Sequence, residues 1–356
     1  MNDRSEKVEF AQRSQGHGPL VAICLATYNP PPELFRNQIE SIVNQTHQNW
    51  VCVISDDASQ PESLAEIEKV IRGDSRFILS VSAERLGFYH NFERCLSMVP
   101  GQADFVALSD QDDFWYPDKL KTLLSCFAPE TTLVYSDMRI VTAQGELIAD
   151  TYWKIRRNNY TNLASLLLAN TVTGAASIFR RRLLSYILPF PPRVGELYHD
   201  HWIAGVALTL GEIAYVASPL YDYLQHPGNV IGHNLQPKAS TPRLIYYLFT
   251  NFATAEGRDQ ARRVYFEVVL KVMSMARALA SRCNGETTWK KRRALRRLAR
   301  LDHPFISGFW LALRGLKEWS QASATFGAEY HLLLGVIWKS YFEIKSRLDR
   351  LRSNVT

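Results

Sequence analysis

Short apolar runs alternate with amphipathic stretches through the first third of the chain. The runs are uninterrupted, so both faces of each predicted strand should be covered, as in a parallel sheet. Between the runs, apolar residues recur with helical spacing. The predicted strands are 20–26, 50–54, 77–81 and 105–108, and the predicted helices are 33–44, 61–72 and 89–98. This alternation predicts an α/β fold with a mainly parallel sheet flanked by helices.

The alternation ends near residue 130, and longer helical patterns take over near residue 241. Before that change we expect strands at 133–136, 173–180, 213–216 and 220–224, a hairpin at 140–148, and helices at 160–169 and 202–210. After it we expect helices at 257–282, 286–301, 305–319 and 330–341. We therefore predict a disordered tail at 1–18, an α/β domain at 19–238 and a basic, aromatic-rich helical extension at 239–356.

Polar residues follow three of the predicted parallel strands. Ligands of such sheets bind in the crevice beyond the carboxyl ends of the strands. The group after the second strand could instead have a structural role, because Asp57 or Ser59 could cap the next helix. The groups are Thr27-Tyr28-Asn29, Asp56-Asp57 and Asp110-Gln111-Asp112.

The fourth strand runs into three carboxylates within four positions, 110–113. Close carboxylates repel one another, and a divalent cation with oxygen ligands and phosphate co-ligands would relieve that repulsion. The alternative is a solvated acidic turn, since Asp also favours turns. The apolar strand before the cluster favours the metal site.

Two further groups carry candidate chemistry later in the chain. Asp200 lies between His199 and His201, just before a predicted helix that starts at Trp202. Its carboxylate could act as a general base, or it could simply cap that helix. His226 lies in a loop and could complete a metal shell, although a lone histidine is more often structural.

Composition sets broad limits on the class of protein. With 356 residues, 46% of them apolar and 21% charged, the chain is globular rather than disordered. A net charge of +6 suits nucleotides, anionic membranes or nucleic acid without choosing among them. The five cysteines show no paired spacing, which argues against disulfides and zinc and favours the cytoplasm. No signal peptide and no apolar run of membrane-spanning length is expected.

Seven stretches together make the chain resemble family-2 glycosyltransferases of the GT-A fold. More narrowly, it is similar to bacterial rhamnosyltransferase-type enzymes that build surface polysaccharides. The stretches occur in family order over about 20–235. They are Ala-Thr-Tyr-Asn at 26–29, Ser-Ile-Val-Asn-Gln-Thr at 41–46, Ile-Ser-Asp-Asp-Ala-Ser at 54–59, Leu-Gly-Phe at 86–88, Leu-Ser-Asp-Gln-Asp-Asp-Phe-Trp at 108–115, and His-Asp-His-Trp at 199–202 with Gln-His-Pro-Gly-Asn-Val at 225–230.

The resemblance implies roles for residues at the matching positions. Asp200 would be the catalytic base that deprotonates the acceptor hydroxyl, giving inversion in a single displacement. The nucleotide sugar would contact Thr27, Tyr28, Asn29, Asp56, Asp57, Asp110 and Gln111. Mg²⁺ or Mn²⁺ would be held by Asp110, Asp112 and His226. The donor or acceptor sugar would lie near Asp113, Trp115, His199, His201 and Trp202.

Three positions depart from the family pattern. Ala58 stands where glycine is usual, and Leu224 stands where an arginine often precedes the Gln-His pair. His199 stands where glutamate is common in the wider family. These departures leave the fold expectation intact but place the phosphate contacts in question.

The predicted activity is transfer of a sugar onto a polyprenyl-diphosphate-linked or growing glycan acceptor in surface polysaccharide synthesis. By resemblance the first donor is dTDP-L-rhamnose, and a UDP-hexose is the alternative. A non-catalytic nucleotide-sugar or glycan binding module is the rival from another class. A nucleotidyltransferase is disfavoured, because 27–32 lacks the glycine-rich phosphate loop that such an enzyme needs.

The basic segment 290–300 adds a surface hypothesis. It could bind anionic lipid headgroups, with nearby aromatic side chains entering the interface. The alternatives are a solvated basic face or a dimer contact, and no nucleic acid is expected. We therefore predict a cytoplasmic protein, peripheral on the inner face of the cell membrane, and the pattern does not fix its oligomeric state.

Overall fold

The computed structural model describes residues 18–142, 144–153, 158–225, 254–319, 325 and 327–353. The chain forms two compact units, which are described separately. The first unit comprises 1–154, 172–190 and 211–234, and the second comprises 155–171, 191–210 and 235–356. The predicted tail, except Gly18, and the predicted ligand His226 lie outside the described residues.

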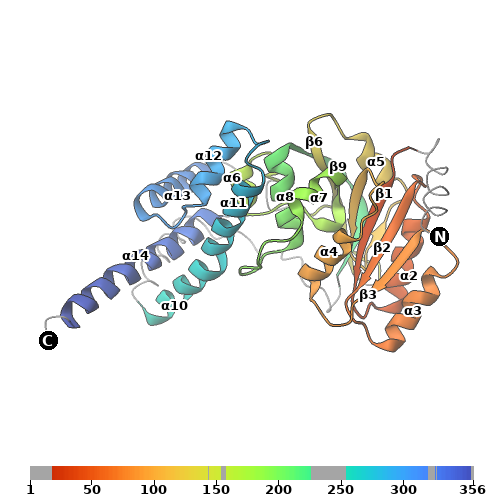
Figure 1. Ribbon diagram of the computed structural model, residues 1–356, viewed down its shortest axis with the longest axis horizontal. Helices are drawn as coiled ribbons and strands as arrows, with labels where there is room; N and C mark the ends of the chain where they lie inside the picture. The colour runs from red at the N-terminus through yellow and green to blue at the C-terminus, as the bar shows by residue number, and fades with distance from the viewer. Residues whose placement is uncertain are drawn as a thin grey trace. The chain divides into compact units, whose positions relative to one another are not determined.

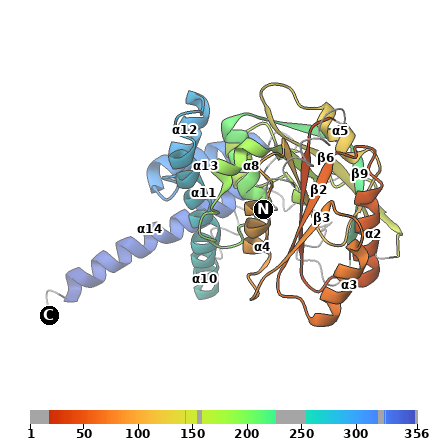
Figure 2. The ribbon, with the colours of Figure 1, turned by 45° about the vertical axis from the view of Figure 1, so that its right-hand side comes forward.

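The first half of the first unit follows the predicted alternation of strands and helices. The strands pair in parallel in the order β3-β2-β1-β4. Helices α2 and α3 lie on one face of these strands and α4 on the other (Figure 1 and Figure 2). The elements are β1 Val21–Thr27, α2 Pro32–Val43, β2 Trp50–Asp56, α3 Pro61–Ile71, β3 Phe77–Val81, α4 Phe88–Ser97 and β4 Phe105–Ser109.

Burial explains why this half could be predicted. Every residue of β2 is buried, and so is nearly every residue of β1, which accounts for their uninterrupted apolar sequences. Helices α2 and α3 each carry a proline in the first turn, where the missing backbone N–H costs nothing. The α/β expectation is therefore confirmed for these elements.

The second half of the first unit combines antiparallel and parallel pairs. Strand β8 pairs antiparallel with both β4 and β6, β6 pairs in parallel with β9, and β9 pairs antiparallel with β5. The whole sheet is therefore mixed, and most of its pairing is parallel, as the sequence predicted. The elements are β5 Phe114–Trp115, α5 Lys119–Ser125, β6 Thr131–Thr142, β7 Leu147–Ala149, β8 Ser177–Arg180, α7 Leu184–Ile187 and β9 Glu212–Gln225.

Strands β6 and β9 are each longer than predicted. The predicted strand 133–136 and the first arm of the predicted hairpin form one strand, β6, and β7 is the second arm. The predicted strands 213–216 and 220–224 likewise join in β9. The two strands shift register around Asp137, whose partner is Pro219. A register shift is where a strand can hold a proline, so the proline that splits the sequence pattern does not break the strand.

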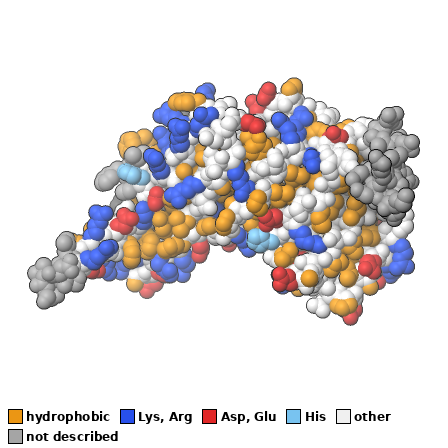
Figure 3. Space-filling model, in the orientation of Figure 1, with side chains coloured by type: hydrophobic (Ala, Val, Ile, Leu, Met, Phe, Trp, Pro, Cys, Tyr) orange, Lys and Arg blue, Asp and Glu red, His pale blue; other side chains and the backbone are white. Residues whose placement is uncertain are grey.

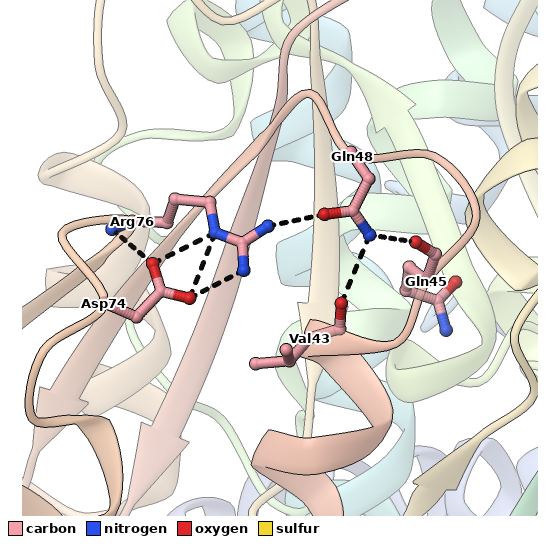
Figure 4. Close-up of polar contacts among 5 residues, drawn as sticks. All are labelled: Val43, Gln45, Gln48, Asp74 and Arg76. Atoms are coloured by element: carbon pink, nitrogen blue, oxygen red, sulfur yellow. Dashed lines mark hydrogen bonds and ion pairs between the residues drawn. The ribbon is translucent and has the colours of Figure 1, made fainter.

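A polar network closes the edge of the parallel half (Figure 4). The Arg76 guanidinium donates to Asp74 at 2.6 Å and to Gln48 Oε1 at 2.8 Å, and Gln48 in turn donates to the carbonyl of Val43. These bonds join the turn before β3 to the loop between α2 and β2. Hydrogen bonding to Arg76 holds the pKa of Asp74 below its usual value.

The regular elements described in the second unit are all helical. Its elements are α6 Leu163–Leu168, α8 His199–Leu210, α10 Ala255–Val264, a π-helical turn Tyr265–Val269, α11 Leu270–Arg282, α12 Trp289–Leu298, α13 Pro304–Trp319 and α14 Ala328–Ser353. Helices α10 and α11 form the predicted helix 257–282, interrupted by the π turn. None of the described helices is long and apolar enough to cross a membrane.

Helices α6 and α8 belong to the second unit although they come from the middle of the chain. Both contact each other and α11, and α6 also contacts α12. A Cβ on Gly205 of α8 would lie 3.3 Å from side-chain atoms of Leu167 and Leu279, tighter than most packing contacts. The glycine therefore allows α8 to approach its neighbours closely. The predicted domain boundary at 238 stays a prediction.

Candidate active site

The structure brings the predicted residues of β1 and β2 together at the carboxyl ends of these strands. Thr27 and Asp56 are register partners, and the Thr27 hydroxyl donates to Asp56 Oδ2 at 3.0 Å. Asp56 also accepts from the amide of Ser59 at 2.9 Å and from its hydroxyl at 2.5 Å. The Asp56 side chain is fully buried, and its hydrogen bonds fix the turn that follows β2.

Asp57 holds a second loop in place. Its Oδ1 accepts from the backbone amide of Leu86 at 2.6 Å, and its Oδ2 accepts from the amide of Gly87 at 2.9 Å. Gly87 has a φ of 80°, a conformation that favours glycine. Asp57 is 2% exposed, so its described contacts are structural. Its contact with a nucleotide stays a prediction.

The loop after β1 connects these groups to the acidic loop after β4. The amide of Tyr28 donates to Gln111 Oε1 at 2.8 Å. Asn29 adopts a positive φ of 41° and donates its amide to the Ser59 hydroxyl at 2.8 Å. Three segments that are far apart in the sequence therefore form one edge, as the rule for parallel sheets predicts.

The acidic loop has two environments. The side chains of Asp110, Gln111 and Asp112 are partly exposed, whereas Asp113 and Trp115 are each 1% exposed. Burial, and then the charges of Asp110 and Asp112, raise the pKa of Asp113 well above its usual range. Asp113 and Trp115 thus lie beneath the loop, and their predicted place near a sugar stays a prediction.

The oxygen ligands at this loop suit a hard divalent cation whose remaining coordination positions are open to other ligands. Mg²⁺ and Mn²⁺ accept one or two carboxylates and complete their shells with water and phosphate oxygens. Asp110 and Asp112 are carboxylates of this kind at a partly exposed position. Within the described ranges, no three His, Cys, Asp or Glu side chains form a ready-made cation site.

The predicted base Asp200 belongs to the second unit. Helix α8 begins at His199, three residues before the predicted start, so Asp200 lies in its first turn. Asp200 Oδ1 accepts from the amide of His201 at 2.5 Å. The His201 ring nitrogen Nε2 lies 3.0 Å from the carbonyl of Leu166 on α6, and Trp202 is fully buried. His201 and Trp202 therefore anchor the helix that carries Asp200.

Burial lowers the pKa of His199 to about 3. The imidazole is therefore neutral at any physiological pH. The side chain next to Asp200 on its N-terminal side therefore adds no charge to this position.

Comparison with known proteins identifies the segment that contains the acidic loop. The family model described as Glycosyl transferase family 2 matches residues 22–188. This segment is a family 2 glycosyltransferase domain. The match includes β1 to β4 and the acidic loop, and it ends before Asp200 and His226.

Relatives of this glycosyltransferase domain carry similar descriptions. The putative glycosyltransferase EpsH of Bacillus subtilis is 28% identical over 225 residues, which cover 60% of this chain and 63% of the relative. Protein CgeD of the same organism is 30% identical, with 54% of this chain and 45% of the relative covered. The dTDP-rhamnosyl transferase RfbG of Shigella flexneri is 26% identical, with 62% and 78% covered. The chain thus spans less than two thirds of the first two relatives.

Among solved structures, the chain is similar to S. aureus TarS 1–349 in complex with UDP-GlcNAc. The two are 14% identical and align with a TM-score of 0.49 over 92% of each chain.

Two cations near the predicted site residues were missed at the sequence level. The Arg85 guanidinium lies over the Tyr28 ring, 3.9 Å from its centroid. Burial lowers the pKa of Lys271 on α11, and the charges of Glu196 and Asp200 act against that lowering, so Lys271 lies near Asp200. The only available signal for Arg85 was its place before the Leu-Gly-Phe stretch, and nothing in the sequence indicated Lys271.

Proposed function

We propose that the chain is an inverting, metal-dependent glycosyltransferase that moves a sugar from a nucleotide donor onto a glycan acceptor. The observation that carries the proposal is the acidic loop, which lies inside a family 2 domain and is bonded through Gln111 to the loop after β1. The nucleotide would lie along this edge, with its diphosphate toward Asp110 and Asp112. Arg85, stacked on Tyr28, adds a positive charge that suits a phosphate or a nucleobase.

In this proposal, different residues of the chain bind the donor and accept the proton. A divalent ion held by Asp110 and Asp112 would stabilise charge on the leaving diphosphate. Asp200 would accept the proton of the acceptor hydroxyl, whose oxygen attacks the anomeric carbon from the face opposite the nucleotide. The bond from that carbon to the diphosphate oxygen breaks, and the nucleoside diphosphate leaves with the electron pair. A single displacement inverts the anomeric configuration.

The proposed donor is dTDP-L-rhamnose, and a UDP-hexose is the alternative. The similarity to a dTDP-rhamnosyl transferase supports the first, at 26% identity. The proposed acceptor is a polyprenyl-diphosphate-linked or growing glycan of a bacterial surface polysaccharide. A non-catalytic binding module is the competing function.

The test is release of nucleoside diphosphate from dTDP-rhamnose, UDP-glucose and UDP-galactose, with Mg²⁺, Mn²⁺ or chelator and a membrane lipid extract as acceptor. Wild type is compared with Asp200→Asn and with Glu256→Gln, which alters an exposed carboxylate in the first turn of α10 in the same unit. We expect metal-dependent release from one donor, about 10²- to 10⁴-fold slower in Asp200→Asn and unchanged in Glu256→Gln. Metal-dependent binding without release from any donor would favour the binding module.

A peripheral membrane contact through α12 is a second proposal. One face of α12 and the residues just after it present an exposed aromatic ring and exposed cations: Trp289, Lys290, Arg293, Arg296 and Arg300. Lys and Arg side chains gather over α12 in the space-filling view (Figure 3). On α13, exposed apolar side chains recur at spacings of four and three residues: Phe309, Leu313 and Leu316. Cations beside apolar side chains suit an anionic lipid surface.

Sedimentation with vesicles tests this contact. We expect binding to phosphatidylglycerol vesicles and little binding to phosphatidylcholine vesicles. Arg293→Glu/Arg296→Glu should abolish binding, whereas Lys69→Glu/Arg72→Glu, the same charge change on and just after α3, should leave it unchanged. Equal binding by both double variants would refute a contact through α12.

A further inference from the structure

Phe114 is an exposed aromatic residue directly after the acidic loop. It is the first residue of β5 and is 42% exposed, whereas Trp115 after it is 1% exposed. Successive side chains of a strand point to opposite faces, so Phe114 lies on the face opposite Trp115. Two residues of chain span about 7 Å at most, which keeps Phe114 close to the proposed metal ligand Asp112. The side chains around this ring therefore indicate what can bind beside the metal.

The pairing of three strands places Phe114 beside two charged side chains. Phe114 of β5 and Arg139 of β6 are both register partners of Asp222 in β9, one on each side of it. Direct partners in a sheet point to the same face. Tyr116 is two residues after Phe114, and its amide continues the pairing by donating to the carbonyl of Leu220 at 3.0 Å. The side chains of Phe114, Tyr116, Arg139 and Asp222 therefore share one face of the sheet.

Hydrogen bonds fix the polar members of this group. The Arg139 guanidinium donates to both oxygens of Asp222, from Nε at 2.8 Å and from Nη2 at 2.9 Å. The Tyr116 hydroxyl donates to Asp222 Oδ1 at 2.5 Å, and the guanidinium carbon lies 5.3 Å from the centroid of the Tyr116 ring. Burial and the bond to Asp222 raise the pKa of Tyr116, so its hydroxyl stays protonated. Side chains held in this way are positioned before any ligand binds.

The charge and exposure of the group favour a neutral ligand with hydroxyl groups. The side chain of Arg139 is 44% exposed and that of Asp222 only 16%. A guanidinium carries five N–H donors, and the bonds to Asp222 use two of them. The ion pair has no net charge, and its carboxylate would repel a phosphate at the same donors. A sugar suits the group better, because its hydroxyls can accept from the guanidinium while its C–H face packs on an aromatic ring.

We propose that Phe114, Tyr116, Arg139 and Asp222 form a sugar-binding subsite next to the proposed metal site. The sugar stacks on the Phe114 ring, and Arg139 donates to its hydroxyls. The inference rests on the proposed function, because it needs a sugar beside the metal-bound diphosphate. That sugar is either the one attached to the donor nucleotide or the first one of the acceptor glycan. Both present the same chemistry, and the experiment distinguishes them.

The test uses variants of the ring and of the guanidinium. Phe114→Leu removes the ring but keeps an apolar side chain, and Phe114→Trp keeps a ring. Arg139→Lys keeps the charge but loses the planar set of donors. Phe266→Leu is the matched control, because Phe266 is similarly exposed, at 48%, and belongs to the second unit.

Two affinities are measured, one for each possible sugar. For the donor, calorimetry with Mn²⁺ compares the dissociation constants of dTDP-rhamnose, UDP-glucose and UDP-galactose with those of dTDP and UDP. For the acceptor, the KM for the membrane lipid extract is determined at saturating donor. The nucleoside diphosphates lack the transferred sugar, so their dissociation constants report on folding and on the nucleotide site alone.

We expect the dissociation constants of UDP and dTDP to be the same in all the proteins. Phe114→Leu and Arg139→Lys should weaken the binding of one sugar about three- to tenfold, as expected for the loss of a single aromatic or hydrogen-bonded contact. Phe114→Trp and Phe266→Leu should behave like wild type. A higher dissociation constant for a sugar nucleotide assigns the subsite to the donor sugar, and a higher KM for the extract assigns it to the acceptor.

The opposite outcomes separate this inference from the proposed function. If wild type is active and Phe114→Leu changes neither affinity, only the inference falls. It also falls if UDP and dTDP binding weakens as much as sugar-nucleotide binding, because the change then disturbs the whole loop. If Phe114→Leu does not fold, Arg139→Lys decides by the same criteria. If wild type binds sugar nucleotides without turnover, the donor comparison decides, and if it binds no nucleotide at all, both proposals fall.

Discussion

Two acidic segments lie at the same edge of the sheet in the first unit, and their surroundings are opposite. Asp56 and Asp57 are buried, and their carboxylates accept hydrogen bonds from the chain itself, from Ser59, Leu86 and Gly87 among others. Asp110 and Asp112 are partly exposed, in a loop supported from beneath. The first pair therefore shapes the backbone around the site, and the second loop is the one available to a ligand. Identical residue types thus hold the backbone at one strand end and remain accessible to a ligand at the next.

Asp112→Asn should separate the two roles most strongly. Removing one carboxylate charge from the proposed metal site should lower kcat/KM about 100-fold or more. The free energy of unfolding should change by only about 0.5 kcal/mol, because the side chain is partly exposed. Nucleoside diphosphate release and urea unfolding measure the two effects, with Glu62→Gln on α3 as an exposed control. A fully active variant would break the comparison.

Asp57→Asn should lower the free energy of unfolding more than Asp112→Asn does. An amide has one acceptor oxygen, so its NH₂ group would face one of the two backbone N–H donors, those of Leu86 and Gly87. Leaving such a buried donor unsatisfied costs about 1–3 kcal/mol in unfolding free energy. Urea unfolding beside Asp112→Asn measures the difference. Equal stability of the two variants would mean that the Asp57 hydrogen bonds do not support the fold.

The pH dependence of stability extends the comparison to His199 in the second unit. Its folded pKa of about 3 is below the value of about 6.5 expected in the unfolded chain. Below pH 6.5 the unfolded chain therefore binds a proton that the folded chain excludes, so stability falls as the pH decreases from about 6.5 toward 3. His199→Gln should flatten this part of the curve. Thermal unfolding at pH 7.5, 6 and 4.5 checks it, and parallel curves would contradict the burial of a neutral imidazole.

Ala58→Gly should give the smallest effect, with the opposite sign. Ala58 follows Asp57 with a φ of 59°, a left-handed conformation that a Cβ disfavours. Glycine should raise the unfolding free energy by about 0.5–1 kcal/mol, after its greater flexibility in the unfolded chain is subtracted. Ala65→Gly, at an exposed position inside α3, is the matched control and should lower stability by about 1 kcal/mol. A loss of stability in both variants would show that the strain at Ala58 is negligible.

The sequence by itself determined the elements from β1 to β4 and the family of the segment 22–188. Their boundaries lie within one or two residues of the predicted ones. Strands buried on both faces and helices that begin with a proline can be recognised from their own residues alone. The polar groups Thr27, Asp56 and Asp110 could be placed at one edge for the same reason. Parallel strands necessarily bring their carboxyl ends together.

Only the tertiary structure decided how the later segments pair and which cations lie near the predicted site residues. An apolar pattern shows that a segment is buried but does not name its neighbour, so the pairing of β8 with both β4 and β6 could not be derived. Helix α8 looked like part of the α/β domain, yet it packs with α11, which follows it by about sixty residues. Nothing in the sequence marked Lys119, the first residue of α5, as buried. Its burial depends on rings and a carbonyl from β5, β9 and the turn at 174–176, which only folding brings together.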